Sequence, residues 1–374
     1  MWDNFFRNMK GEIMIESKEV TQERKTNKYG LEMFSKEKSQ FIAFYKEHLE
    51  AELEKLEIKR QQFMKGLIPR VIAAPFLIMI IYYAFHEFTI FVVPAAPIAV
   101  FGWIGLYWMR HKSKLEAQAK ALIIPELIQF MNPHFTYDPE ASLTLKDVNS
   151  MHIFKNKADN IVGDDLIEGY VYDAQEQART KVSFSEVGVL NTRKIYQGKK
   201  IISKPLGVLA IGLLFKADFN KDFGKSFTMI KPRWLLKKRK YRKKLRLFDK
   251  HSNMQEVHLE NPEFSKQFIV HSNDQIEARV ILQADTMENI LAFVNYLPDT
   301  IERKPKRRKR SRFIPYITFH NNQVYVLIHT KSNHFILNIM KKLDIDTVYD
   351  YFKDINLVLR FIDDLNLNLK LYQK

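Results

Sequence analysis

The sequence predicts an α+β protein. An N-terminal amphipathic helix and a two-helix transmembrane hairpin precede a cytoplasmic domain with a mixed β-sheet and packed helices. Two nearly uncharged arms follow each other between Leu67 and Met109. Each arm has about 20 residues, and at ~1.5 Å per residue it spans a hydrocarbon core ~30 Å thick. Beyond Val148, apolar runs of strand length alternate with segments of helical period, which indicates a sheet with helices packed on it.

The segment before the hairpin falls into two parts. Residues 1–34 are polar and irregular, and we expect a disordered tail. Residues 35–65 place apolar side chains at helical spacing among many charged ones, which predicts an amphipathic helix that leads into the membrane. This helix can pack on the sheet domain or on a second copy of the chain, so a homo-oligomer stays open.

The hairpin is expected over residues 66–110, with a short turn at His86-Glu87. Arg70 is the one charge in its two arms, whereas Lys and Arg are frequent just outside them. Short flanks rich in Lys and Arg remain on the cytoplasmic side, so both termini are expected in the cytoplasm. The alternative is a buried hairpin of a soluble protein. The late start of the apolar stretch argues against a signal peptide.

The cytoplasmic domain is expected over residues 111–374. A helix should end at Asn132-Pro133, and a C-terminal helix should cover 346–365. Strands are expected in MHIF (151–154), DDLIEGYVYD (164–173), TKVSFSEVGVL (180–190), LGVLAIGLLFKAD (206–218), 226–230, 245–248, 256–259, 313–319 and 324–328, with a turn at His320-Asn321-Asn322. Helix starts are expected at Asn261-Pro262, at Ser272 with Gln275, and at Asp285 with Glu288.

Positive signs of catalysis are absent from the sequence. The chain has no cysteine, which removes thiolate chemistry and Cys-based metal sites. The 11 histidines form no H-E-x-x-H helix, and no G-x-S-x-G elbow occurs. The segment from Asp218 to Met229 mimics a calcium loop and a phosphate loop but lacks the glycine that either needs. We therefore expect no cofactor and no metal, and an enzyme is the less favoured reading.

Residues 161–330 resemble the bacterial family of unknown function called DUF3137. The similar motifs are DDLIEGYVYD, VSFSEV, GLLFKADFNKDFGKSFTMI and, most specifically, VHLENPEFSKQFIVHSNDQIEARVIL. In the last motif Asn261, His271 and Val280 depart from the family pattern. The resemblance implies the fold and a setting in a bacterial inner membrane, but no reaction.

The matching residues have no assigned role. They either line a polar site or serve as helix caps and surface ion pairs. They are Asp218, Asn220, Lys221, Glu263, Phe264, Asp274, Gln275, Glu277 and Arg279.

Two basic runs are the clearest functional signal. Lys231–Arg246 holds ten basic residues and no acid, and Arg303–Arg312 holds eight and no acid, so the rest of the +16 chain is close to neutral. On a domain tethered to a bilayer, such loops are expected to contact anionic lipid headgroups. The candidate lipid-binding residues are Lys237, Lys238, Arg239, Lys240, Arg242, Lys243, Lys244, Arg307, Arg308, Lys309 and Arg310.

Other readings of the basic runs remain open. The same charges can bind nucleic acid, with Trp234, Tyr241 and Phe248 stacking on bases. The sheet domain can also hold an unrecognised active site, or the loops can bind an acidic protein partner. Solvated loops are the plainest alternative. The sequence favours a membrane-tethered binding or scaffold module.

Overall fold

The computed structural model describes residues 36–85, 89–154, 158–172, 179–197, 200–219, 225–233, 253–301, 315–329 and 340–365. The chain divides into two units, Met1–Met33 and Phe34–Lys374. The first unit, which includes nearly all of the expected tail, lies outside the described residues. The architecture below is that of the second unit.

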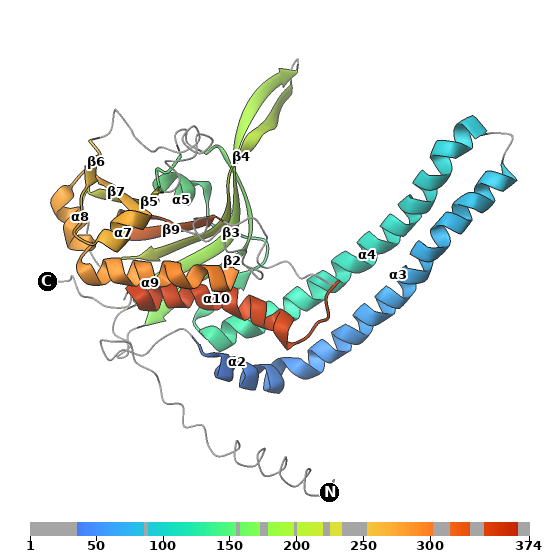
Figure 1. Ribbon diagram of the computed structural model, residues 1–374, viewed down its shortest axis with the longest axis horizontal. Helices are drawn as coiled ribbons and strands as arrows, with labels where there is room; N and C mark the ends of the chain where they lie inside the picture. Colours follow the sequence, from blue (N-terminus) through green and yellow to red (C-terminus); the bar gives the residue numbers. More distant parts are fainter. Residues whose placement is uncertain are drawn as a thin grey trace, which may run out of the picture. The chain divides into compact units, whose positions relative to one another are not determined.

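The described strands form a nine-stranded sheet in the order β1-β2-β3-β4-β9-β8-β5-β7-β6 (Figure 1). Every pairing is antiparallel, which corrects the expected mixed sheet. Short connections such as the one between β8 and β9 can join only antiparallel neighbours. The strands are β1 (Phe135–Asp138), β2 (Asn160–Tyr172), β3 (Arg179–Gln197), β4 (Lys200–Asp218), β5 (Phe227–Pro232), β6 (Gln255–Val257), β7 (Phe268–Ser272), β8 (Tyr316–His320) and β9 (Gln323–His329).

The turn between β8 and β9 has the expected sequence. Asn321 and Asn322 both have positive φ, at 49° and 58°. A two-residue hairpin of this twist needs left-handed backbone at both positions, which Asn tolerates better than most residues. The turn thereby sets His320 opposite Gln323.

The described helices are α2 (Lys38–Phe44), the π-helix η1 (Tyr45–Leu49), α3 (Glu50–Ala84), α4 (Thr89–Met131), α5 (Leu145–Ser150), α7 (Pro262–Gln267), α8 (Gln275–Ile281), α9 (Ala284–Ile301) and α10 (Ile345–Leu365). The expected amphipathic helix and the first apolar arm are one continuous helical segment, Lys38–Ala84. Likewise, α4 joins the second arm to the helix that follows it and ends before Asn132, as predicted. The two long helices lie side by side (Figure 1).

Each face of the sheet packs on its own hydrophobic cluster. The larger cluster lies under α9 and α10, which cross one face in Figure 1. Phe361 of α10 contacts Phe215 of β4 and Phe293 of α9, with ring centroids 5.0 and 4.8 Å apart. The smaller cluster, on the other face, includes Val148 of α5 and Leu214 of β4. Since Leu214 and Phe215 are consecutive in a strand, they point to opposite faces.

The helical segment before the membrane arm is part of the larger cluster. Phe41 of α2 is fully buried, and its ring centroid lies 4.8 Å from that of Phe352 in α10. The backbone N–H of Lys36 donates to Asn356 Oδ1 at 2.8 Å, and Asn356 Nδ2 donates to the Lys36 carbonyl at 3.0 Å. Of the two packing modes expected for this helix, the one on the sheet domain is therefore present.

A buried carboxylate on α3 joins that helix to the segment before α10. Glu57 accepts the backbone N–H of Leu343 at 2.9 Å. Its two oxygens also accept from Arg60 Nε and Nη2, at 2.7 and 2.8 Å, and from Gln61 Nε2 at 3.1 Å. The side chain of Glu57 is 9% exposed. An unpaired charge is unfavourable in a buried position, so these hydrogen-bond donors stabilise the ionised carboxylate of Glu57.

Several expected elements differ in detail. MHIF forms no strand; Met151 lies buried under the sheet, and its carbonyl accepts from Thr318 Oγ1. Helix α8 is capped by Asp274 rather than Ser272, whose hydroxyl accepts the Asp274 N–H at 3.1 Å and thereby forms the turn just before the helix. Helix α9 begins one residue before Asp285. The strand expected at 245–248 lies outside the described residues.

Candidate functional site

The structure places the family-motif residues mainly in structural positions. Asn261 caps α7, and its Oδ1 accepts the N–H of Phe264, a core residue that is 1% exposed. Asp274 Oδ1 caps α8 by accepting the N–H groups of Ile276 and Glu277, both at 3.0 Å. These cap interactions fix the start of each short helix against the sheet.

The polar family-motif side chains are spread over separate elements. Asp218 ends β4 and accepts from Gln323 of β9 at 3.2 Å. Glu263 forms an exposed ion pair with Lys266 on α7, which leads into β7, and three strands separate β4 from β7. The Arg279 guanidinium donates to the Gln275 carbonyl at 3.1 Å within α8. Asn220 and Lys221 lie outside the described residues.

The candidate lipid-binding residues of both basic runs, at 237–244 and 307–310, also lie outside the described residues. The start of the first run is described and belongs to the fold. Lys231 is a buried residue of β5, and Arg233 Nε donates to the Ser265 carbonyl at 2.7 Å. Lys231 and Arg233 therefore belong to the fold and not to the expected basic loop.

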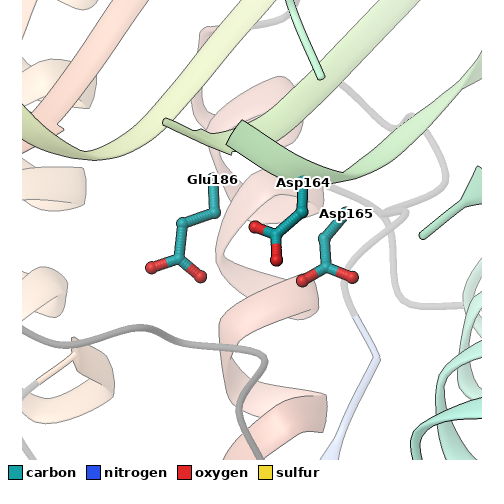
Figure 2. Close-up of side chains that lie close together, drawn as sticks. All are labelled: Asp164, Asp165 and Glu186. Atoms are coloured by element: carbon teal, nitrogen blue, oxygen red, sulfur yellow. The ribbon is translucent and has the colours of Figure 1, made fainter. Parts of the chain in front are cut away.

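Three carboxylates meet where β2 bends away from regular pairing with β3. Asp164 pairs in register with Glu186, and the register shifts between Asp164 and Ile167. Asp165 occupies the bulge with φ of 59°, so its side chain turns to the same side as those of its two acidic neighbours (Figure 2). One carboxylate oxygen from each of the three residues lies within 4.8 Å of those of the other two.

A lysine neutralises part of this acidic cluster, and a tyrosine donates a hydrogen bond to it. Lys120 Nζ of α4 lies 2.7 Å from an oxygen of Asp165 and 4.0 Å from one of Asp164. The Tyr137 hydroxyl of β1 donates to Asp165, whose side chain is 1% exposed. The cluster thus ties α4 to β1 and β2 by charge-assisted hydrogen bonds.

The pKa values of the cluster reflect burial and crowding. Burial, and then the Asp165 charge, raise the pKa of Asp164, while Lys120 opposes the rise. Burial, and then the hydrogen bond to Asp165, raise the pKa of Tyr137. Three carboxylates of this kind could hold a hard cation, but Lys120 already supplies the positive charge at the most buried of them. The arrangement is explained as a structural ion cluster.

Sequence reasoning did not single out this cluster. DDLIEGYVYD and VSFSEV were noted for their resemblance and as strands, but not as a place where acids converge. The sequence did contain one signal for the cluster. Two adjacent acidic residues begin the expected strand at Asp164, which breaks the alternation of apolar and polar side chains. Lys120, 45 residues away on α4, could not be paired with them from spacing alone.

A second place that gathers charge is an open hollow of about 500 Å³ at the start of α10. Its cations already have neighbours. Lys353 forms an ion pair with Asp350 at 2.9 Å, and Lys38 lies 5.0 Å from the ring centre of Tyr349. Asp344 caps the helix by accepting the Thr347 N–H at 3.2 Å. Four lysines and three aspartates line the hollow, so most of its charge is offset within it.

The long helices expose apolar surface over a limited length. On α3 and the turn after it, large apolar residues are more than a third exposed from Ile68 to Phe85; on the described part of α4 they are so from Ile98 to Met109. The segment Lys38–Ala84 is, among the described residues, the helix long and apolar enough to cross a membrane by length and composition. Elsewhere in the described chain, exposed large apolar side chains are isolated, for example Ile276.

The inner sides of α3 and α4 meet through aromatic contacts. The ring of Phe63 lies 5.8 Å from Tyr107 and 5.5 Å from Trp108, centroid to centroid. Gly66 lies so close to Tyr107 that an added Cβ would collide with the phenol oxygen. A small residue is thus required where the two helices approach each other.

Taken with the fold, these features define a class: an α+β protein whose antiparallel sheet domain is joined to a long apolar helix of membrane-spanning length. Residues 211–367 match the model of the family described as "Protein of unknown function (DUF3137)". The resemblance inferred from the motifs is confirmed, with a matched range that begins later and ends later than 161–330. Comparison with curated proteins and with solved structures found no match.

Proposed function

We propose that this protein is a membrane-tethered cytoplasmic binding module, anchored by α3 and α4 as a two-span hairpin. The observation that supports this most is the apolar surface confined to facing stretches of the two helices. Ile72 is 62% exposed and Ile98 is 72% exposed, and neither has a covering element within the described chain. Contiguous apolar surface of this extent is rare on soluble monomers and is the expected outer surface of a membrane segment.

The length and the flanks of the hairpin fit a bilayer. From Leu67 to Phe85 the helix rises about 28 Å at ~1.5 Å per residue, close to the hydrocarbon thickness. Tyr107 and Trp108 lie at the domain end of this stretch, where amphipathic rings favour the interface. Arg110 and Lys112 follow immediately, so the end beside the sheet domain is the cytoplasmic one.

On this proposal, the two basic runs give the tethered domain its binding surface. The residues that contact anionic headgroups are those at 237–240, 242–244 and 307–310. Each Lys or Arg near an anionic leaflet contributes ~1 kcal/mol, and the attraction decays over a Debye length of ~10 Å. Because the anchor already holds the domain at the membrane, the two basic runs bind the lipid headgroups cooperatively. Neither run needs a high affinity of its own.

The absence of native cysteine makes the anchor simple to test with single-cysteine variants. Phe85→Cys places a thiol at the hairpin turn, and Gln118→Cys places one on an exposed position of α4. In intact cells we expect a membrane-impermeant maleimide to label the Phe85→Cys variant only, and to label Gln118→Cys only after permeabilisation. Labelling of both variants under the same condition would refute the two-span hairpin.

Docking of the basic runs is tested on the full chain in nanodiscs. A donor dye on a Ser311→Cys variant reports energy transfer to acceptor-labelled lipid headgroups, with the dye on Gln118→Cys as the control. Transfer from the Ser311→Cys dye should be higher in anionic than in zwitterionic nanodiscs and should fall with salt. Changing Lys237, Lys238, Arg239, Lys240, Arg307, Arg308 and Arg310 to Glu should abolish the difference. Transfer independent of lipid charge would leave the runs without a lipid role.

A further inference from the structure

We propose that Arg70 forms a binding site for the phosphate of one anionic phospholipid, at the cytoplasmic end of the hairpin. This inference rests on the proposed membrane anchor and names a specific ligand site within it. Charged residues inside a membrane segment are costly, and they persist where a partner or a function requires them. Arg70 lies within the apolar stretch of α3, where a charged side chain needs a stabilising partner.

The guanidinium of Arg70 is held by aromatic rings instead of by a carboxylate. Its Cζ lies 4.0 Å from the ring centre of Tyr107 and 5.5 Å from that of Trp103, both on α4. Its Nη1 donates to the Gly66 carbonyl, one turn back along α3. Among the described residues no Asp or Glu forms an ion pair with it. The charge is therefore positioned but not neutralised.

The hydrogen-bonding capacity of Arg70 is also incompletely used. A guanidinium has five N–H donors. One of them is used by Gly66, and the buried Nε has no hydrogen-bond partner in the structure. Because protein atoms cover Nε, an oxygen reaches it only after a small movement of the side chain. The missing acceptor, unfavourable by roughly 1–3 kcal/mol, favours that movement. Bidentate acceptance by two oxygens of one anion is what a guanidinium fork accommodates best.

The direction of the side chain identifies where that anion would be. Since Nη1 reaches back to Gly66, the side chain runs toward the N-terminal end of α3, away from the hairpin turn. This end carries Lys65 and Arg60 and the aromatic contacts around Phe63. Long cationic side chains near helix ends extend toward the headgroup layer in this manner. The anions at that depth of a cytoplasmic leaflet are lipid phosphates.

The aromatic rings give the site a fixed shape. Cation–π contact with Tyr107 and Trp103 restricts the guanidinium plane, so little side-chain entropy is lost when phosphate binds. The close approach at Gly66 brings Tyr107 within reach of Arg70. The site is thus formed by the packing of the hairpin itself. A lone arginine elsewhere on the membrane segment would have no such support.

The test measures lipids retained by the purified full-length protein in native mass spectrometry, with phosphatidylglycerol and phosphatidylcholine supplied in equal amounts. Wild-type protein should retain one phosphatidylglycerol in preference to phosphatidylcholine, because the choline cation offsets the charge of the phosphate in phosphatidylcholine. Arg70→Gln should reduce that preference roughly tenfold or more, and Arg70→Lys should keep part of it, because an ammonium lacks the bidentate fork. Arg110→Gln removes the same charge from an exposed position of α4 and serves as the matched control.

Equal losses in Arg70→Gln and Arg110→Gln would show diffuse attraction and overturn the site, as would no loss in Arg70→Gln. Insertion is read independently by labelling the Phe85→Cys variant with and without each arginine substitution. If the hairpin inserts normally while lipid retention is unchanged, only the Arg70 site is refuted. If the wild-type hairpin does not insert, the proposed anchor fails and the site fails with it. If Arg70→Gln alone fails to insert, its lipid retention is not interpretable, and the Arg70→Lys variant decides whether the site exists. If Arg70→Lys keeps the full wild-type preference for phosphatidylglycerol, bidentate binding by the guanidinium is overturned.

Discussion

The buried Glu57 should contribute strongly to the stability of the joint between α3 and the segment before α10. The hydrogen bonds from Arg60, opposed by burial and aided by the Leu343 N–H, lower its pKa from 4.5 to about 2. A shift of roughly 2.5 units corresponds to about 3 kcal/mol at 1.36 kcal/mol per unit. Glu57→Gln keeps an acceptor for Leu343 but leaves Arg60, with 13% of its side chain exposed, without its counter-charge.

We expect Glu57→Gln to destabilise the detergent-solubilised protein by about 2–3 kcal/mol, which lowers the apparent Tm by roughly 5–10 °C. The assay is a thermal melt followed by intrinsic fluorescence, and Glu54→Gln, at an exposed position on the same helix, is the control. The wild-type contribution is complete above pH 4.5 and is lost as pH falls toward 2, because the folded-state pKa is the lower one. A Tm for Glu57→Gln within 1 °C of that of Glu54→Gln would refute the reasoning.

Three further perturbations test other contacts in the same melting assay. Gly66→Ala should destabilise by about 1–3 kcal/mol through collision with Tyr107, whereas Gly102→Ala, which has open space, should be neutral or slightly stabilising; equal effects would contradict this. Lys120→Met should destabilise by about 3 kcal/mol, more than Lys114→Met, because it leaves the buried Asp165 without its cation. Burial, and then nearby Lys231, lower the pKa of His271 from 6.5 to about 4. Stability should therefore fall by about 3 kcal/mol between pH 6.5 and 4, and His271→Phe, but not His258→Phe, should remove that fall.

Local signals predicted the elements whose ends depend on neighbouring residues. Asn132 ends α4, Asn261 caps α7, and Asn321-Asn322 forms the β8–β9 turn, each as the sequence indicates. In each case the side chain or the permitted φ angle acts within a few residues, so spacing alone contains the information. The C-terminal helix was likewise visible from its period and begins at Ile345.

Features that depend on tertiary contact were missed. Strand β7 lies between α7 and α8 in the sequence, and all five of its residues are buried. It therefore shows no alternation of apolar and polar residues, and no turn sequence marks it. The antiparallel pairing of β5 with β7 and with β8 joins strands that are far apart in the chain, so spacing could not reveal it. The acidic cluster needed both the left-handed Asp165 and its contact with Lys120 on α4. The roles of Asn220 and Lys221 remain predictions.

The reciprocal pair between Lys36 and Asn356 joins positions 320 residues apart, and it has a consequence for the order of folding. At 5–20 residues per second, a ribosome needs roughly 15–65 s to synthesise the intervening chain. Throughout that interval α2 exists without the α10 surface that later buries Phe41. The newly made helix therefore keeps its aromatic side exposed until α10 has been synthesised. The N-terminal helix therefore obtains its packing partner among the last elements to be made.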